Sequence, residues 1–441
     1  MSGLDRIREA AGKDKNLRFT SLMHHITIDL LREAYKALNR DAIPGIDKVT
    51  WQQYGEDLEG NLSNLHQRVQ SGRYRAQPSK RIWLPKPDGR QRPIGIAVLE
   101  DKINQQAVTW VLNQIYEEDF MGFSYGFRPG RSQHNALDAL WVGIKQRKIN
   151  WVLDADMRSF FDTVNHDWLM KFIEHRIADP RLLRLIRKWL RAGVSENGQW
   201  SKTTVGTPQG AVISPILANI YLHYVLDLWV NQWRRKQASG EVIIVRYADD
   251  MVIGFQYQSE AEHFLQELKE RLAKFGLELH QEKTRLIEFG RFAAANRAAR
   301  GEGKPETFDF LGFTHICATT RKNNHFTVRR KTIAKRLQGK VKAVREEIMR
   351  RRHDPVPEQG KWLRSVVQGH LNYYAVPGNK QSTDAFRTEV IRGWIHALRR
   401  RSQKARSLTW ERAKRLVKTW IPKARVLHPY PSQRLHVTNP R

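Results

Sequence analysis

The segment Val245-Arg246-Tyr247-Ala248-Asp249-Asp250-Met251-Val252 decides the interpretation of this chain. Two adjacent aspartates stand between two apolar runs, and this pattern predicts a β-hairpin with acids at its tip. Like charges at such close range require a cation to offset them, and carboxylate oxygens are hard ligands that suit magnesium. Taken alone, Tyr-x-Asp-Asp also fits a solvated turn, so the surrounding segments have to decide.

A second short apolar run, Trp151 to Leu153, also ends in carboxylates. Both runs have the composition of buried strands. Phosphoryl transfer with two metal ions requires carboxylates from more than one strand, and Asp156 can supply the third. Downstream, Ser259 and Glu262 predict a capping box at the start of a helix that Gly276 closes. Strands that alternate with helices predict an α+β domain.

The charge of the chain indicates a polyanionic partner. Its 441 residues include 76 Lys and Arg against 45 Asp and Glu, a net charge of +31. Such a surplus repels itself in a compact protein unless a partner neutralises it, which favours nucleic acid over a mere solubility surface. By count, residues 317–441 hold about 31 basic and 7 acidic residues, with aromatic rings between the basic clusters. This composition predicts a helical, nucleic-acid-binding region, in which most rings pack between helices.

Cysteine usage and hydropathy restrict the class of protein further. Cys317 is the only cysteine in the sequence, which excludes an internal disulfide and any zinc site built on paired cysteines. No signal peptide or membrane-spanning run is visible, so we expect a soluble cytoplasmic protein. A chain of 441 residues is longer than a domain with a single hydrophobic core usually is, so we expect more than one domain. We expect an N-terminal helical extension over 1–64, an α+β unit over 65–316 and a basic helical domain over 317–441.

Further motifs surround the aspartates: Leu84 to Pro93, Tyr125 to Ser132, Asp154 to Asp162, Gly206 to Gly210, Ser214 to Asn219, Gly276 to Leu279, Glu282 to Thr284, Phe310 to Phe313 and Gly369 to Tyr374. Their order and approximate spacing resemble those of reverse transcriptases encoded by bacterial group II introns. The resemblance extends from about Ile46 to Pro377, which is most of the chain.

This resemblance implies a fold and an activity. The fold is a right-hand polymerase, with fingers and a palm whose sheet is ferredoxin-like, followed by a basic α-helical thumb or maturase domain. The activity is RNA-directed DNA polymerisation from deoxynucleoside triphosphates with two magnesium ions, together with a splicing role on intron RNA. It identifies Asp156, Asp249 and Asp250 as the catalytic metal ligands, and it gives Asp154 and Asp162 structural roles.

The resemblance also assigns residues to the substrates. The residues implied for the incoming nucleotide are Lys86, Arg92, Phe161, Gln209 and Tyr247. Those implied for the nucleic-acid strands are Arg128, Arg131 and Lys283. Phe161 is interpreted as the gate that selects deoxyribonucleotides, because it stands five residues beyond Asp156, while Phe160 should pack. The alternatives are that the Leu84 to Pro93 hairpin is only a solvated turn and that both rings are plain core.

Two other functions remain open at this point. One is an RNA-binding splicing factor on an inactive polymerase scaffold, which the presence of all three acids disfavours. The other is a polymerase with a domesticated role in repair or phage defence. Many relatives continue into a nuclease with Cys and His metal ligands, and the sequence to Arg441 lacks these, so we expect no target-DNA nicking. The RNA partner, the priming mechanism and the oligomeric state are not fixed by the sequence.

Overall fold

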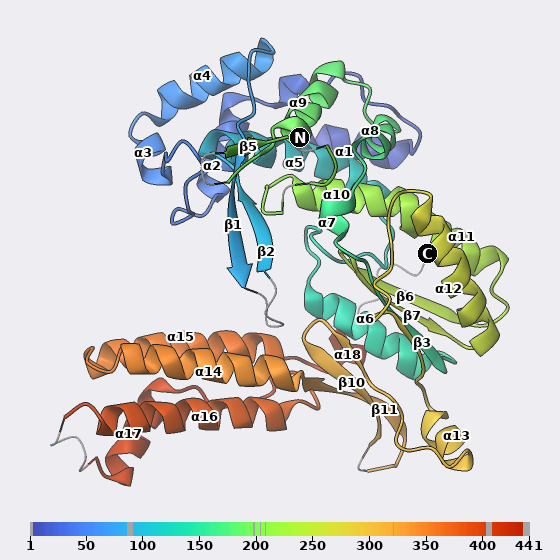
Figure 1. Cartoon of the computed structure of the whole chain (residues 1–441), viewed down its shortest axis with the longest axis vertical. Helices are drawn as coiled ribbons and strands as arrows, with labels where there is room; N and C mark the ends of the chain where they lie inside the picture. The colour runs from blue at the N-terminus through green and yellow to red at the C-terminus, as the bar shows by residue number, and fades with distance from the viewer. Residues whose placement is uncertain are drawn as a thin grey trace.

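A computed structural model describes residues 3–85, 91–196, 199–202, 204–207, 209–320, 322–402 and 408–434. Helices and three separate sheets make up the described chain (Figure 1), which confirms the predicted mixture of α and β structure. None of the described helices combines the length and the apolar composition needed to cross a bilayer.

The acids lie on a four-stranded sheet that we call the acidic sheet. Its strands, in spatial order, are β6 (Val242–Tyr247), β7 (Asp250–Phe255), β3 (Trp151–Asp156) and β8 (Arg285–Glu288). All neighbouring strands are antiparallel. The chain passes from β3 through several helices to β6 and β7, and then through α12 (Gln258–Ala273) to β8. This order and these connections match a ferredoxin-like βαββαβ unit.

Both faces of the acidic sheet are buried. Leu153 and Ile253 belong to a core that contains residues of α12, whereas Val152 and Val252 belong to a second core with residues of α6 (Gln133–Gln146). Alternate residues of a strand point to opposite faces. Burial on both sides explains why these strands read as continuous apolar runs rather than as alternating patterns.

The start of α12 differs from the prediction. The helix begins at Gln258, after Tyr257, and no side chain caps it. Ser259 therefore lies inside the first turn, and the side chain of Glu262 accepts a hydrogen bond from Gln258 at 2.8 Å. The predicted capping box was wrong. Gly276 follows the last turn with a φ of 73°, a left-handed conformation that glycine adopts without strain, as expected.

The N-terminal helices share the larger core with the acidic sheet. They are α1 (Gly3–Lys13), the 3-10 turn η1 (Met23–His25), α2 (Ile28–Ala37), α3 (Trp51–Gly55) and α4 (Leu58–Gln70). The long helix α5 (Leu99–Asp119) contacts α1 and α2. Beside them lies a second sheet, the hairpin sheet, whose order is β2 (Gln91–Ile96), β1 (Ser79–Pro85), β4 (Val194–Glu196) and β5 (Gln199–Ser201).

Helices between β3 and β6 and after β8 complete this part of the molecule. They are α7 (Phe160–Thr163), α8 (His166–Glu174), α9 (Pro180–Arg191), α10 (Ser214–Leu222), a π-helical turn η2 (His223–Asp227), α11 (Leu228–Lys236) and α13 (Ala293–Ala299). Every residue from α10 to the end of η2, apart from Pro215 and Tyr224, is buried, so this stretch forms the centre of the larger core.

The C-terminal part contains a small sheet and a helical bundle. The sheet has the order β11 (Phe326–Thr332), β10 (Phe313–Thr319) and β9 (Phe308–Phe310). The helices are α14 (Ala334–Arg350), α15 (Val356–Tyr374), α16 (Lys380–Arg399), α17 (Trp410–Trp420) and α18 (Pro431–Arg434). Residues of α14 to α17 form a core of their own. The predicted domain boundaries, after residues 64 and 316, fall inside α4 and β10.

Candidate active site

Strand pairing brings the three predicted catalytic aspartates to one end of the acidic sheet. Asp156, the last residue of β3, pairs with Asp250, the first residue of β7. Asp250 also pairs with Tyr247 across the hairpin, which leaves Ala248 and Asp249 as a two-residue turn. Residues from two distant segments are therefore neighbours because of the register of one antiparallel ladder.

A cavity of about 420 Å³ opens beside this edge of the sheet. Its charged lining residues are Asp154, Asp156, Asp250, Glu282, Asp309, Lys283, Arg285 and Arg336. Asp249, in the turn, is not part of the lining. Both signs of charge are present, so the cavity can accommodate a cation next to the carboxylates and an anion next to the basic groups.

The carboxylates oppose each other's ionisation. Burial raises the pKa of Asp250 to about 7, and the charges of Asp249 and Asp156 add to the rise. Burial also raises the pKa of Asp249, again with a contribution from Asp156. The Lys283 ammonium lies 2.6 Å from a carboxylate oxygen of Asp156. A bound cation would lower these pKa values, because it stabilises the ionised form.

The donor chemistry fits a divalent metal, although the ligands are not already grouped. Over the described ranges, no set of three or more His, Cys, Asp or Glu side chains is arranged to hold an ion. Asp156 instead contacts the Lys283 ammonium. Carboxylate oxygens at the ends of rigid strands are nevertheless the ligands that magnesium prefers. A metal bound at Asp156 would compete with the Lys283 ammonium for the carboxylate oxygen Oδ2.

The turn that carries Asp249 is strained and braced. Ala248 has a φ of 56°, a conformation that residues other than glycine rarely adopt but that tight hairpin turns require. The guanidinium of Arg246 donates a hydrogen bond to the Ala248 carbonyl oxygen at 2.9 Å. On the other side, Gly126 lies so close that a Cβ atom there would clash with the Ala248 backbone. The surroundings therefore hold the turn in its unusual conformation.

Arg246 is itself held by a buried network. Its Nε and Nη2 donate to the two carboxylate oxygens of Asp227 at 2.7 and 2.6 Å, and both residues are essentially inaccessible to solvent. Further hydrogen bonds join the guanidinium to Ser124 at 2.7 Å and to Asn219 at 3.2 Å. Asp227 ends the π-helical turn η2, a local distortion often found at functional sites. No motif in the sequence predicted this network. Its one signal was a charged residue directly after the apolar run Val242–Val245.

Two residues predicted to bind the nucleotide are in contact. Arg92, exposed on β2, donates a hydrogen bond from Nε to the side-chain oxygen of Gln209 at 2.9 Å. Phe161 is half-buried, whereas Phe160 packs into the core with its ring 5.4 Å from that of Phe161. The backbone oxygen of Phe161 accepts a hydrogen bond from the Thr207 N–H at 2.7 Å. The loop around Thr207 is thus fixed to the segment that follows the acidic strand.

The other residues predicted to bind the incoming nucleotide make fewer contacts in the described chain. Tyr247 is half-buried at the end of β6, with its ring 6.3 Å from that of Phe127. Lys86 lies outside the described residues. Lys283, predicted to contact nucleic acid, is engaged by Asp156 in this structure.

The two arginines that were predicted to contact nucleic acid, Arg128 and Arg131, lie in different environments. Arg128 is buried, pairs with Glu117 at 2.9 Å and donates to the Met121 carbonyl oxygen at 2.8 Å. This geometry argues against a template contact for Arg128, because its buried guanidinium would have to leave the carboxylate that pairs with it. Arg131 is half-buried and donates to the Gly122 carbonyl oxygen at 2.5 Å, so one edge of its guanidinium is also occupied.

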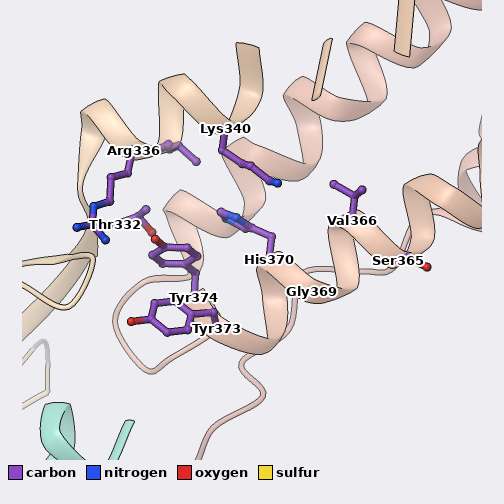
Figure 2. A pocket seen from close by; sticks show the side chains of 10 residues that line it. Thr332, Arg336, Lys340, Ser365, Val366, Gly369, His370, Tyr373 and Tyr374 are labelled. Atoms are coloured by element: carbon purple, nitrogen blue, oxygen red, sulfur yellow. The ribbon is translucent and has the colours of Figure 1, made fainter. Parts of the chain in front are cut away.

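A second cavity, of about 380 Å³, separates α14 from α15 (Figure 2). Figure 2 shows Arg336 and Lys340 on α14, with His370 and Tyr374 on α15 facing them. Burial lowers the pKa of His370 to about 4, and the charge of Lys340 contributes, so this imidazole is neutral at pH 7. Arg336 lines both this cavity and the one beside the aspartates. The cavity between the basic helices therefore adjoins the cavity beside the aspartates, with Arg336 between them.

Comparison with known proteins identifies the class. The family described as "Reverse transcriptase (RNA-dependent DNA polymerase)" matches residues 84–315. Protein YkfC of Escherichia coli (strain K12) is 35% identical over 286 residues, which cover 57% of this chain and 75% of the relative. The group II intron-encoded protein LtrA of Lactococcus lactis subsp. cremoris is 36% identical over 256 residues, covering 56% of this chain and 42% of LtrA. Nuclear intron maturase 3 of Arabidopsis thaliana is 30% identical over 125 residues, covering 28% of this chain and 17% of the maturase.

The chain belongs to the reverse transcriptase (RNA-dependent DNA polymerase) family. Within this family it groups with the group II intron reverse transcriptases and maturases. The chain spans three quarters of one of these relatives and less than half of another.

Proposed function

We propose that this protein is an RNA-directed DNA polymerase, which extends a primer on an RNA template by nucleotidyl transfer from deoxynucleoside triphosphates. The observation that carries the proposal is the register of the acidic sheet, which pairs Asp156 with Asp250 beside the turn that holds Asp249. In this proposal the acidic sheet is the palm, the hairpin sheet belongs to the fingers, and α14 to α17 form the thumb or maturase domain.

Asp156, Asp249 and Asp250 would hold two magnesium ions, which when bound activate the primer hydroxyl and offset charge on the reacting phosphate. The protein's own groups prepare this site. Lys283 neutralises Asp156 until the carboxylate is needed as a ligand. The Arg246 network fixes the backbone of the turn, so that the position of Asp249 does not depend on a flexible loop.

Basic groups on either side of the aspartates suit the two substrates. Arg92 is exposed on the hairpin sheet, and its contact with Gln209 orients the guanidinium for a triphosphate. Arg336 and Lys340 have no acid partner within hydrogen-bonding distance in the described chain, and they lead from the acidic cavity into the second one. They can bind phosphates of the strand that leaves the active site.

Phe161 is proposed as the residue that selects the sugar. It follows the acidic strand closely, is half-buried, and is held through its backbone by Thr207. A ring under the sugar of the incoming nucleotide leaves no space for a 2′-hydroxyl group, which is the only difference between ribonucleotides and deoxyribonucleotides at that position.

A maturase role is proposed for the C-terminal helices. Their strong excess of basic residues provides an electrostatic surface for RNA, and the likeness to LtrA and to an intron maturase supports RNA binding beyond the template. The partner in this proposal is an intron RNA.

Primer extension with Asp249→Asn tests the polymerase proposal. The variant should lose orders of magnitude in rate, because one charge of a metal ligand is removed while its shape is kept. Asp41→Asn, an exposed aspartate on the N-terminal side of the molecule, is the matched control and should extend at the wild-type rate. Extension by Asp249→Asn at the control rate would show that the aspartates are not the catalytic centre.

A further inference from the structure

Helix α9 (Pro180–Arg191) divides sharply into an apolar and a basic face. Its buried residues are Leu182, Leu183, Leu185, Ile186, Trp189 and Leu190. All the remaining residues between 181 and 191 are basic: Arg181, Arg184, Arg187, Lys188 and Arg191. Apart from Pro180 at its start, the part of this helix that is not buried thus consists of cations, of which Lys188 donates hydrogen bonds to the carbonyl oxygens of Gly72 and Tyr74 at 2.8 and 2.6 Å.

Such an arrangement destabilises the folded protein unless a partner is present. The cations recur three or four residues apart, at spacings where like charges repel each other along a helix. Arg181 also lies in the first turn, near the positive end of the helix dipole. The pKa of Lys188 is lowered by burial and by the neighbouring charges of Arg184 and Arg75. Of the five, Arg187 alone has an acid partner in the described chain, Glu174 at 2.6 Å.

The basic face is separate from the proposed primer-template path. Figure 1 shows α9 beside α8 and the N-terminal helices, at the opposite end of the molecule from α14 to α17. A cavity of about 340 Å³ adjoins the face, and Lys171, Arg187 and Arg191 contribute to its lining together with Asp167 and Glu174. A ligand on α9 would therefore extend along α8.

The chemistry of the face restricts the partner. The apolar side of α9 is packed inside the protein, where Trp189 donates a hydrogen bond to the Tyr74 hydroxyl at 2.9 Å, so the helix has no apolar face to insert into a bilayer. Trp189 is also the only aromatic residue of the helix, so α9 offers no ring on which an unpaired base could stack. A row of cations repeated at each helical turn, about 5.4 Å apart, suits a repeating phosphate backbone.

We propose that the basic face of α9 is a second nucleic-acid-binding surface, which holds the phosphate backbone of a double-helical segment of a folded RNA while the acidic site works on the primer and template. The inference rests on the RNA-binding part of the proposed function and adds where a folded RNA, as distinct from the copied strand, is held.

The test uses the full-length protein and a blunt-ended RNA duplex as the probe. The variant Arg181→Gln, Arg184→Gln, Arg191→Gln removes three charges from α9. The control variant Arg235→Gln, Lys236→Gln, Lys269→Gln removes three exposed charges from α11 and α12. The α9 variant should bind the duplex at least about tenfold more weakly, and the slope of log affinity against log salt should fall by about three, one per lost phosphate contact. The control should change affinity less than about twofold.

Two further measurements separate this surface from the polymerase site and from folding. Both variants should extend a saturating short primer-template at the wild-type rate, and Arg184→Gln alone should raise the melting temperature, because it relieves repulsion on the helix. Wild-type duplex affinity and salt slope in a folded α9 variant would overturn the proposal, as would a loss of binding that always accompanies a loss of extension. If the wild-type protein failed to extend any primer, the polymerase proposal would fall, while the binding comparison would still decide the role of α9.

Discussion

The buried pair of Arg246 and Asp227 should determine both the stability of the protein and the conformation of its acidic turn. The two side chains are 1% and 0% exposed and share two charge-assisted hydrogen bonds of 2.7 and 2.6 Å. Asp227→Asn keeps the shape of the side chain but leaves the guanidinium buried without a counter-charge. Removal of one member of a buried pair destabilises proteins by about 3–5 kcal/mol. We expect a loss of that size in the free energy of unfolding, measured by denaturant titration.

The double variant Arg246→Met, Asp227→Leu separates stability from positioning. It leaves no lone buried charge, so it should be clearly more stable than Asp227→Asn. It also removes the hydrogen bond from Arg246 to the Ala248 carbonyl oxygen, which leaves a strained φ of 56° without its brace. Primer extension per folded molecule should therefore fall, with a higher magnesium concentration needed for half-maximal rate, even where unfolding is near that of the wild type.

The exposed pair of Lys36 and Glu33 provides the control, since both side chains are more than half accessible. Glu33→Gln should leave both unfolding and extension unchanged. Wild-type stability of Asp227→Asn would mean that the guanidinium is not dependent on its counter-charge. Wild-type extension and magnesium dependence in the folded double variant would refute the role of Arg246 as a brace of the turn.

Three further predictions concern the sugar, the pH and the C-terminal cavity. Phe161→Ala should incorporate ribonucleotides while it largely retains deoxyribonucleotide incorporation; unchanged sugar discrimination in a folded, active variant would show that the ring is only core. Burial raises the pKa of Asp101 to about 7, above its ordinary value of 3.8, with the Tyr74 hydroxyl bonded to it. The folded state thus retains a proton that the unfolded state releases, so wild-type stability should decrease as the pH rises from about 4 through 7, and Asp101→Asn should flatten this decrease in pH-dependent unfolding; an identical pH profile in both proteins would contradict the assignment. Arg336→Gln with Lys340→Gln should weaken primer-template binding and reduce its salt slope by about two, whereas equal slopes would exclude these groups as phosphate contacts.

The sequence alone was sufficient for features that depend on local order. The acids between two apolar runs predicted the hairpin of β6 and β7, and the position of Asp156 at the end of a strand-like run predicted the end of β3. The excess of positive charge in the last part of the chain is likewise a property of composition. Such features follow from strand periodicity, turn preferences and net charge, which neighbouring residues determine without reference to the rest of the fold.

Tertiary structure decided which distant residues meet. The pairing of Asp156 with Asp250 depends on a ladder register that no local pattern specifies. The same holds for Arg246, whose counter-charge Asp227 comes from a π-helical turn. It also holds for Arg128, which was predicted to contact nucleic acid but is buried against Glu117. The position of an arginine in the sequence does not show whether a carboxylate will pair with it in the folded protein. That outcome is set by long-range packing, because a buried charge is stable only where the fold supplies its partner.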